Sequence, residues 1–174
     1  YLHQGEQFLI KELDLDLQIA YSVRTHVPYY TEIRDSTEMK VLNKLKEKTA
    51  GRTTVYLGEV NVSTRVLGYK RKRHFSEEVV SEENLDLPAQ NYNTVAIWFG
   101  LPEDTLSYMR TRRFDLAGGL HAIEHAAIGV LPLFALCDRN DIGGISTPLH
   151  PDTGLPQVFI HDGHPGGVGI AERG

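Results

Sequence analysis

The hydrophobic pattern changes from strand-like to helix-like about 100 residues into the chain. In the first part, apolar residues form short runs or alternate with polar ones, which is typical of β-strands. The clearest predicted strand covers residues 53–62, which are rich in β-branched residues and alternate with a period of two. Residues 115–137 instead repeat large apolar side chains every three or four positions, as amphipathic helices do. The pattern therefore predicts β-structure first and one long helix later.

Further strands are predicted from short apolar runs that are bounded by polar or turn-forming residues. They cover residues 6–13, 19–23, 27–33, 66–72, 94–99 and 157–162. A polar turn before residue 66 predicts a hairpin with residues 53–62, whereas the lysine-rich end of residues 37–45 suits a turn or a short helix. Strands at this spacing predict a small antiparallel β-barrel or a curled sheet.

The later part is predicted to hold a short helix and then the long one. Acidic residues directly after Pro102 start the short helix, and Asp115 is placed to cap the long helix. Pro132 should kink or end it. Residues 76–92 are predicted to be a solvated connection, and a last helix is expected from Val168. The fold class is therefore α+β, with a small antiparallel β-barrel or curled sheet followed by a subdomain built on a long apolar helix.

Length and composition suit a folded protein of one domain or two small ones. The chain has 174 residues, of which 41% are hydrophobic and 24% charged. We divide it into a β-rich subdomain over residues 1–87 and a helix-centred subdomain over residues 88–174, which ends in a glycine-rich loop. Both ends of the sequence resemble the middle of a chain, so we expect a piece of a longer protein. No uncharged apolar run reaches about 18 residues, so no membrane span and no membrane partner are expected.

Charge and cysteine content indicate which partners and which cellular compartment to expect. The net charge of −5 does not favour nucleic-acid binding by the whole surface, but basic residues are clustered. The run Lys70, Arg71, Lys72 and Arg73 lies between Tyr69 and Phe75 and combines cations for phosphates with aromatic rings for bases. We predict a nucleic-acid contact at this run; the alternative is a solvated hairpin tip. A single cysteine, Cys137, excludes an internal disulfide and fits a reducing compartment, so we expect a cytoplasmic protein.

The long helix carries a compact group of ionisable residues, His121, Glu124 and His125. The two histidines are four residues apart and lie on the same side of the helix, and Glu124 lies between them and the apolar stripe. A helix that is apolar nearly all round is usually buried on several sides. We therefore interpret the three residues as a hydrogen-bonded structural cluster whose partners include Asp141 and Asp162 in later loops. This interpretation assigns no metal ligand and no catalytic residue.

The same spacing has a chemical alternative. His-x-x-Glu-His is a motif in which two imidazoles bind zinc and the glutamate acts as a base. A metal site, or a metal-dependent hydrolase built on His121, Glu124 and His125, is therefore kept as the alternative. The glycine-rich segment 163–169 is interpreted as a tight turn. It lacks the lysine of a P-loop, and Asp162 directly before it would repel a phosphate.

Six motifs occur together in a definite order along the chain. They are Leu2-His3-Gln4-Gly5, Tyr29-Tyr30-Thr31, Gly68-Tyr69-Lys70, residues 118–126, residues 141–144 and residues 162–169. This ordered set resembles the C-terminal accessory region of the YprA/MrfA-type DEAD/DEAH-box helicases, which are superfamily 2 DNA helicases related to the fungal Hrq-type enzymes. The resemblance covers nearly the whole chain. It implies an accessory nucleic-acid-binding and structural module of an ATP-dependent 3′-to-5′ DNA helicase in DNA repair.

The resemblance also implies cofactors and partners that residues 1–174 do not supply. ATP with magnesium and a four-cysteine zinc site are expected in the full-length protein, with the cysteines shortly after residue 174. The implied partners are single-stranded or forked DNA and the motor domains of the same chain. Residues 1–174 contain neither a P-loop lysine nor a DEAD or DEAH box, so no ATP hydrolysis is expected from them alone.

Overall fold

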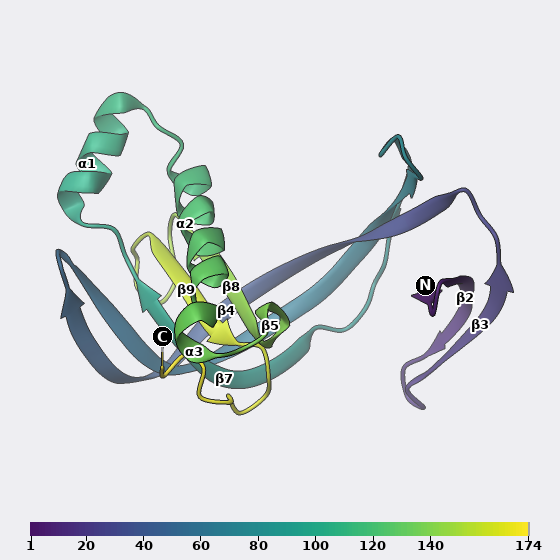
Figure 1. Cartoon of the computed structure of the whole chain (residues 1–174), viewed down its shortest axis with the longest axis horizontal. Helices are drawn as coiled ribbons and strands as arrows, with labels where there is room; N and C mark the ends of the chain where they lie inside the picture. Colours follow the sequence, from purple (N-terminus) through teal and green to yellow (C-terminus); the bar gives the residue numbers. More distant parts are fainter. Residues whose placement is uncertain (174) are drawn as a thin grey trace. The chain divides into compact units, whose positions relative to one another are not determined.

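The computed structural model describes residues 1–173, most of them in antiparallel strands (Figure 1). One sheet contains β1 (Leu2–His3), β2 (Glu6–Asp14) and β3 (Ile19–Thr25). The second sheet has the order β4-β5-β7-β9-β8, with β6 paired to β5. Its strands are β4 (Tyr29–Ala50), β5 (Thr53–Arg73), β6 (Val79–Asn84), β7 (Gln90–Phe99), β8 (Ile142–Thr147) and β9 (Gln157–Asp162).

The chain divides into two compact units. Unit 1 contains Tyr1–Ser36 and Arg65–Pro88, and unit 2 contains Thr37–Thr64 and Ala89–Gly174. The predicted division into residues 1–87 and 88–174 differs from these units over residues 37–64 and at Pro88. The physical reason is strand pairing, since residues 55–64 of β5 pair with β7 in unit 2.

Strands β4 and β5 are longer than the sequence pattern predicted. β4 is a strand of 22 residues that includes the lysine-rich segment, so the predicted turn or short helix there is wrong. β5 is a strand of 21 residues that continues through the polar positions before residue 66, so the predicted hairpin is also wrong. Ser63 and Thr64 pair with Asn91 and Gln90 of β7 instead of turning. Partner strands therefore override a weak local turn signal.

Two other predicted segments also differ from the structure. The acidic segment 76–92 is not only a connection, because its residues 79–84 form β6, which pairs with residues 68–72 of β5. Glu82 and Glu83 lie opposite Lys70 and Tyr69 in this register, so cross-strand charge pairing favours a strand. No helix starts at Val168 within the described residues, which form turns and bends there.

The helices lie in unit 2 and begin and end close to the predicted residues. They are α1 (Glu103–Arg112), α2 (Leu116–Val130) and α3 (Pro132–Ala135), followed by a 3-10 turn, η1 (Arg139–Asp141). The predicted cap is confirmed, because the Asp115 side chain accepts a hydrogen bond from the Gly118 amide. The predicted break at Pro132 is confirmed as well, since α2 ends at Val130 and α3 begins at the proline.

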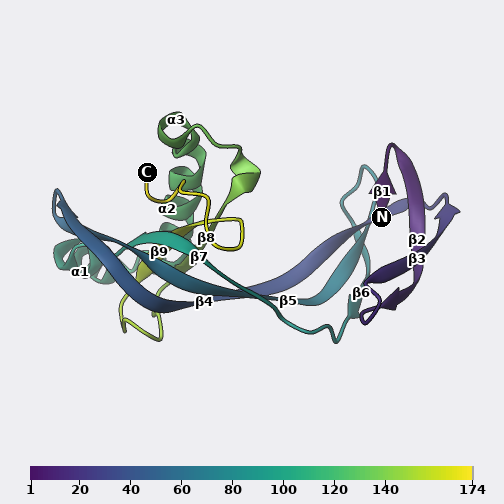
Figure 2. The ribbon, with the colours of Figure 1, turned by 90° about the horizontal axis from the view of Figure 1, so that it is seen from below.

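The core of unit 2 has two parts, on opposite faces of β9. Val158 and Ile160 face the helices and pack with Leu120, Ile128 and Leu131. Alternation along the strand sends Phe159 to the other face, where it joins a second cluster of buried side chains. The other members of that cluster are Met39, Val60, Val62, Ala96 and Trp98. All six residues of β9 are buried, which explains its continuous apolar sequence. Figure 2 shows α2 and α3 beside β8 and β9.

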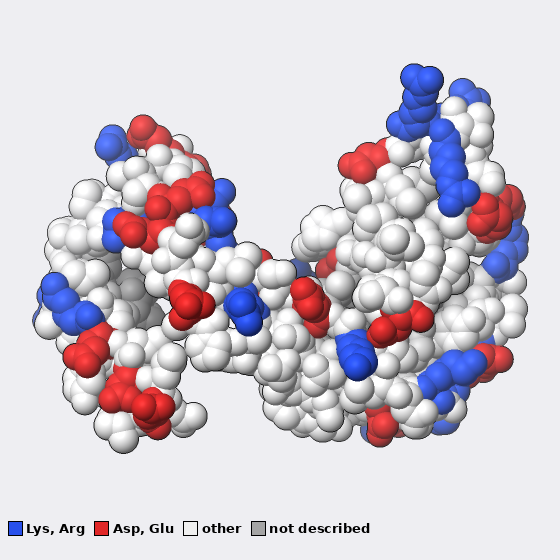
Figure 3. All heavy atoms as spheres, turned by 180° about the vertical axis from the view of Figure 1, so that it is seen from behind, with Lys and Arg blue, Asp and Glu red and all other residues white. Residues whose placement is uncertain are grey.

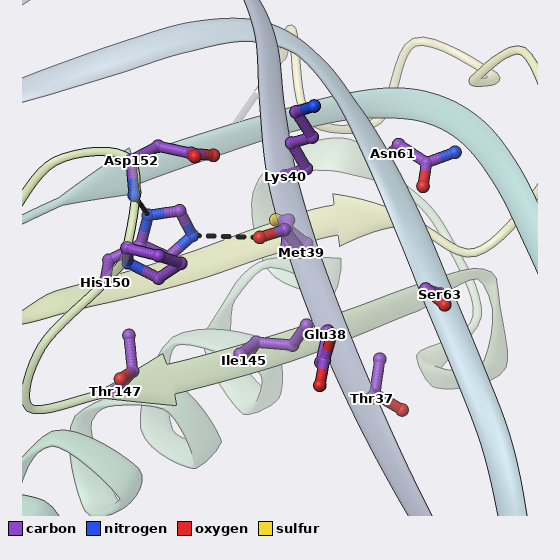
Figure 4. Close-up of a pocket in the computed structure, with 11 residues that line it drawn as sticks. Thr37, Glu38, Met39, Lys40, Asn61, Ser63, Ile145, Thr147, His150 and Asp152 are labelled. Atoms are coloured by element: carbon purple, nitrogen blue, oxygen red, sulfur yellow. Dashed lines mark hydrogen bonds between the residues drawn. The ribbon is translucent and has the colours of Figure 1, made fainter.

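The strands of unit 2 form a nearly closed antiparallel barrel, which confirms the predicted α+β fold class. The loop between β8 and β9 bonds to the edge strand β4 through side chains. His150 Nε2 donates to the Met39 carbonyl at 3.1 Å (Figure 4). The Asp152 carboxylate accepts from the Val41 amide at 2.8 Å. Residues 39 and 41 present their backbone groups to the same side of a strand. The two side chains therefore occupy the position that a neighbouring strand would take.

Helix α2 is buried along one face only. Leu120, Glu124, Ile128 and Leu131 are buried. The expectation that α2 is buried on several sides is therefore wrong, because most of its other positions are exposed. By length and apolar composition alone, Leu116–Ala135 would be long enough to cross a membrane. In the structure its apolar face instead covers β8 and β9, as the core helix of a folded domain does.

We expect Leu120→Ala to destabilise unit 2 strongly. Leu120 is fully buried between α2 and the sheet, and large-to-small substitutions at such sites cost about 2–5 kcal/mol. Val130→Ala is the matched control, because Val130 lies on the same helix with about half of its surface exposed. Urea denaturation followed by circular dichroism would measure both changes. Equal losses in the two variants would contradict the one-sided burial of α2.

Candidate functional site

The ionisable residues of α2 form a chain of hydrogen bonds that reaches β8. His125 Nε2 lies 3.1 Å from His121 Nε2, and His121 Nδ1 lies 3.3 Å from Glu124 Oε2. The same carboxylate oxygen accepts a hydrogen bond from Ser146 Oγ at 2.6 Å. A carboxylate can only accept hydrogen bonds, so His121 Nδ1 carries a proton, and in the neutral imidazole the lone pair is then on Nε2.

Glycine at position 144 allows α2 to approach β8 this closely. A Cβ atom at Gly144 would lie 2.7 Å from Glu124 Cγ and 2.7 Å from Ile128 Cδ1, which is too close for real atoms. Gly144 therefore sets the distance between helix and strand. This distance is what allows Ser146, two residues later on β8, to donate to Glu124.

Burial differs sharply within the cluster. The Glu124 side chain is only 9% exposed, whereas the His121 side chain is 63% exposed and His125 is also exposed. Glu124 fits the predicted structural role, because a buried carboxylate needs partners and has two. The structural interpretation assumed that the histidines are buried and need protein partners. They are exposed, so water can supply their hydrogen bonds. As a hydrolytic base, Glu124 would need to face a metal-bound water, whereas its Oε2 atom is engaged by Ser146 and His121.

Within residues 1–173, Asp141 and Asp162 lie in separate hydrogen-bond networks and do not bond to the α2 cluster. Asp141 accepts from His164 Nε2 at 3.1 Å and from the Asp138 amide at 2.9 Å. The hydrogen bond from His164 holds the pKa of the Asp141 carboxyl below its usual value, and the Asp138 amide adds to this effect. Asp141 thus links the turn before β8 to the glycine-rich loop.

Asp162 occupies the anion-binding position of the glycine-rich loop. Its fully buried carboxylate accepts from the backbone amides of residues 168, 169, 170 and 171 at distances between 2.6 and 3.3 Å. Successive amides pointing to one place form an anion-binding nest. Since Asp162 already fills this nest, the tight-turn interpretation accounts for the loop geometry without a phosphate.

His161 was not singled out by the sequence and is buried inside the barrel. Its Nδ1 donates to the Asp162 carbonyl at 2.9 Å, and its ring meets Tyr92 edge to face with centroids 6.4 Å apart. Burial lowers the pKa of His161, because the charged imidazolium loses its hydration there. The sequence could have indicated this burial, because the apolar run around His161 is typical of a strand that is buried on both faces.

The predicted nucleic-acid contact, Lys70–Arg73, lies at the end of β5 in unit 1. Each cation has a glutamate partner. The pairs are Lys70–Glu82 at 3.5 Å, Arg71–Glu83 at 2.9 Å, Lys72–Glu32 at 2.6 Å and Arg73–Glu78 at 3.7 Å. Figure 3 shows basic and acidic side chains beside one another on the face that it displays. A phosphate that binds here would therefore have to displace these carboxylates from the cations.

Aromatic rings surround the same run. The Arg71 guanidinium lies 5.4 Å from the ring centre of Tyr69 and 5.7 Å from that of Tyr29, within the range of cation–π contacts. His74 follows the run and has a tilted contact with Phe75, whose side chain is fully exposed. Phe75 has a positive φ of 69°, in the turn between β5 and β6. The turn therefore presents one exposed aromatic ring next to several cations.

Unit 1 also holds a groove of about 680 Å³ lined mainly by apolar and aromatic side chains. Phe8, Leu9 and Ile10 of β2 line it together with Val66 of β5 and Tyr69. Several apolar residues of β2 and β3, among them Leu13, Ile19 and Val23, are exposed. A contiguous apolar surface of this kind is typical of a surface that another part of a protein covers.

Comparison with known proteins identifies the relatives of the chain. Residues 123–174 match the family described as the MrfA Zn-binding domain. The chain is 32% identical over 99% of its length to the ATP-dependent helicase YprA of Bacillus subtilis, covering 23% of that protein. It is 26% identical over 82% of its length to the ATP-dependent helicase hrq1 of Schizosaccharomyces pombe, covering 13% of that protein.

A solved structure gives the same result. The crystal structure of the helicase MrfA bound to DNA matches 99% of this chain with a TM-score of 0.67 and 31% identity, and the match covers 23% of that protein. The predicted resemblance to an accessory region of YprA/MrfA-like helicases is thus confirmed. The chain spans 23% of YprA and of the MrfA structure and 13% of hrq1.

The family description names zinc, so the potential zinc ligands of this chain are of interest. Structural zinc sites are four-coordinate and use cysteine and histidine ligands. The chain contains one cysteine, Cys137, so it does not hold a four-cysteine site within its own residues. Within residues 1–173, His121, Glu124 and His125 are the one group of three potential ligands whose donor atoms all lie within 4.8 Å of one another. Imidazole nitrogen and carboxylate oxygen are both donors that zinc accepts.

We expect the stability of the fold to decrease as the pH falls below about 6.5. His161 is held neutral by burial, so its pKa is lower when folded than when unfolded. Between the two pKa values the unfolded chain binds the extra proton, which lowers the free energy of unfolding as the pH decreases. His161→Gln should reduce this slope in urea denaturation measured from pH 7.5 to 5.5. His26→Gln, at an exposed histidine, should keep the wild-type slope; a slope unchanged in His161→Gln would contradict the assignment.

Proposed function

We propose that this chain, which is similar over 99% of its length to an accessory part of ATP-dependent helicases of the YprA/MrfA type, contacts DNA beside the motor domains of a longer helicase. The observation that carries the proposal is the match of the whole chain to one quarter of a helicase that was crystallised with DNA. Its role would be to guide or separate a strand that leaves the motor, within ATP-dependent 3′-to-5′ unwinding in DNA repair. We expect this to take place in the cytoplasm.

The division of labour follows from the residues that the chain contains. ATP hydrolysis requires groups that hold the phosphates and magnesium, and the chain has no P-loop lysine. The motor domains would therefore bind ATP with magnesium and hydrolyse it. We also propose that the zinc of the full-length protein is held by four cysteines outside residues 1–174.

The turn between β5 and β6 is the contact surface that we propose. Successive residues of a strand point to opposite faces, so Lys70 and Lys72 share one face and Arg71 and Arg73 share the other. Exposed ion pairs contribute only about 0–1 kcal/mol, so a phosphate can replace the glutamate partner of the exposed Arg73 at little cost. Lys70, Arg71 and Lys72 are only partly exposed. Arg73 is the most exposed of the four cations, and Phe75 lies two residues further along the turn.

This arrangement suits an unpaired strand better than a duplex. Base stacking on an exposed aromatic ring contributes about 1–3 kcal/mol per base and requires a base whose face is free. Single-stranded or forked DNA provides such bases, whereas a duplex keeps them stacked. The apolar groove of unit 1 adjoins this contact, because Arg71 and His74 also line it, and we propose that the motor domains of the same chain cover its apolar part.

Replacing Lys70, Arg71, Lys72 and Arg73 together with alanine should weaken binding of single-stranded DNA by the full-length helicase. Each lost phosphate contact should also make the plot of log affinity against log salt shallower by about 0.7. Fluorescence anisotropy at several salt concentrations would measure both effects.

A charge-matched control is available on β4. Lys40, Lys44, Lys46 and Lys48 are all exposed, so replacing these four with alanine changes the net charge equally on unit 2. This control should keep the wild-type slope. If the β4 variant and the β5 variant reduce the slope equally, the effect is one of net charge and the proposed contact is wrong.

Phe75→Ala should reduce affinity for single-stranded DNA by about 5- to 150-fold if one base stacks on the ring, which corresponds to about 1–3 kcal/mol. The salt slope should remain unchanged, because no cation is lost. Phe134→Ala is the matched control, since Phe134 is largely exposed on α3 in unit 2. Equal affinities of wild type and Phe75→Ala would exclude stacking at this ring.

A further inference from the structure

We infer that His121 and His125 form an open binding site for a transition-metal ion, with zinc as the probe of choice, on the exposed face of α2. The site would be distinct from a four-cysteine zinc site and would use residues of this chain alone. It does not depend on the proposed contact with DNA. Three observations support it: the separation of the two ring nitrogens, the hydrogen bonds behind His121, and the exposure of both rings.

The separation of the two Nε2 atoms is close to the value that a shared metal requires. They lie 3.1 Å apart, with the ring planes nearly perpendicular at 84°. Zinc–nitrogen distances of about 2.0–2.1 Å in a tetrahedral site place two ligand nitrogens about 3.3 Å apart. The distance between the two nitrogens would therefore increase by only about 0.2 Å, while the rings turn so that both lone pairs point at the ion.

The hydrogen bonds behind His121 prepare its ring for coordination. Metal-binding histidines usually donate their second N–H to a carboxylate or carbonyl, which fixes the tautomer and raises the basicity of the ligand nitrogen. His121 Nδ1 donates to Glu124, and Ser146 on β8 holds the same carboxylate oxygen from the other side. The lone pair of His121 is therefore fixed on Nε2, facing His125.

His125 completes the pair by a change of tautomer. Without an ion, its Nε2–H donates to the lone pair of His121 Nε2. When an ion binds, the proton of His125 moves to Nδ1 by exchange with water, and both Nε2 atoms carry lone pairs. No net proton is released and no other bond changes.

The exposure of the rings distinguishes this arrangement from a purely structural pair. The His121 side chain is 63% exposed and His125 is also exposed, so neither ring needs the other to satisfy a buried group. The neighbouring exposed positions of the helix are small, namely Gly118, Ala122, Ala126 and Gly129. Two histidine ligands leave coordination positions open, which water or an external donor would fill.

Zinc titration of the purified protein tests the inference. Zinc that the protein already holds stays in place, so isothermal titration calorimetry counts only additional ions. We expect about one additional equivalent in wild type, and loss of that equivalent in both His121→Ala and His125→Ala. His26→Ala removes an exposed histidine elsewhere and should retain it. Circular dichroism should show all three variants folded, because the changed side chains are exposed and Ser146 still donates to Glu124 when His121 is replaced.

Glu124→Gln provides a second variant with a different expected result. Loss of a carboxylate behind a histidine ligand typically weakens metal affinity by about 10- to 100-fold without removing the ligands. We therefore expect unchanged stoichiometry with weaker binding. The inference is wrong if wild type takes up no additional zinc, or if His125→Ala and wild type bind it equally.

Discussion

The contact between α2 and the two C-terminal strands is the interaction on which unit 2 depends. Gly144 lets the helix approach β8, and Leu120, Ile128 and Leu131 fill the space against β9. A buried carboxylate lies inside this apolar contact and would destabilise it without partners, because an unpaired buried charge costs several kcal/mol. Ser146 and His121 supply those partners. Packing and hydrogen bonding therefore fix the same helix position together.

In the C-terminal loop, too, acidic side chains find their hydrogen-bond partners within the protein. Asp162 takes four backbone amides of the glycine-rich segment, and Asp141 takes His164 from the same loop. The glycine-rich motif, which resembles a ligand-binding loop, thus stabilises the fold through its backbone amides. Groups left available to a ligand are found on the outside, at the exposed histidines of α2 and at the turn between β5 and β6.

The two candidate sites differ in how strongly the fold prepares them. At α2, a carboxylate and a hydroxyl orient one histidine, so little reorganisation would accompany metal binding. At the turn between β5 and β6, glutamates already neutralise the cations, so DNA would have to exchange with them. That exchange costs least at Arg73, the most exposed of the four cations, and it would make binding sensitive to salt.

The sequence by itself determined the fold class, the cap at Asp115, the break at Pro132 and the family resemblance. These features depend on local signals, namely periodicity, capping chemistry and motifs in order. Tertiary structure decided that β5 runs through Ser63 and Thr64, because β7 supplies partners that a local pattern does not contain. It also decided which face of α2 is buried, and so left His121 and His125 exposed while enclosing Glu124. Burial depends on what packs against a residue, and for α2 the partners are two strands later in the chain, β8 and β9.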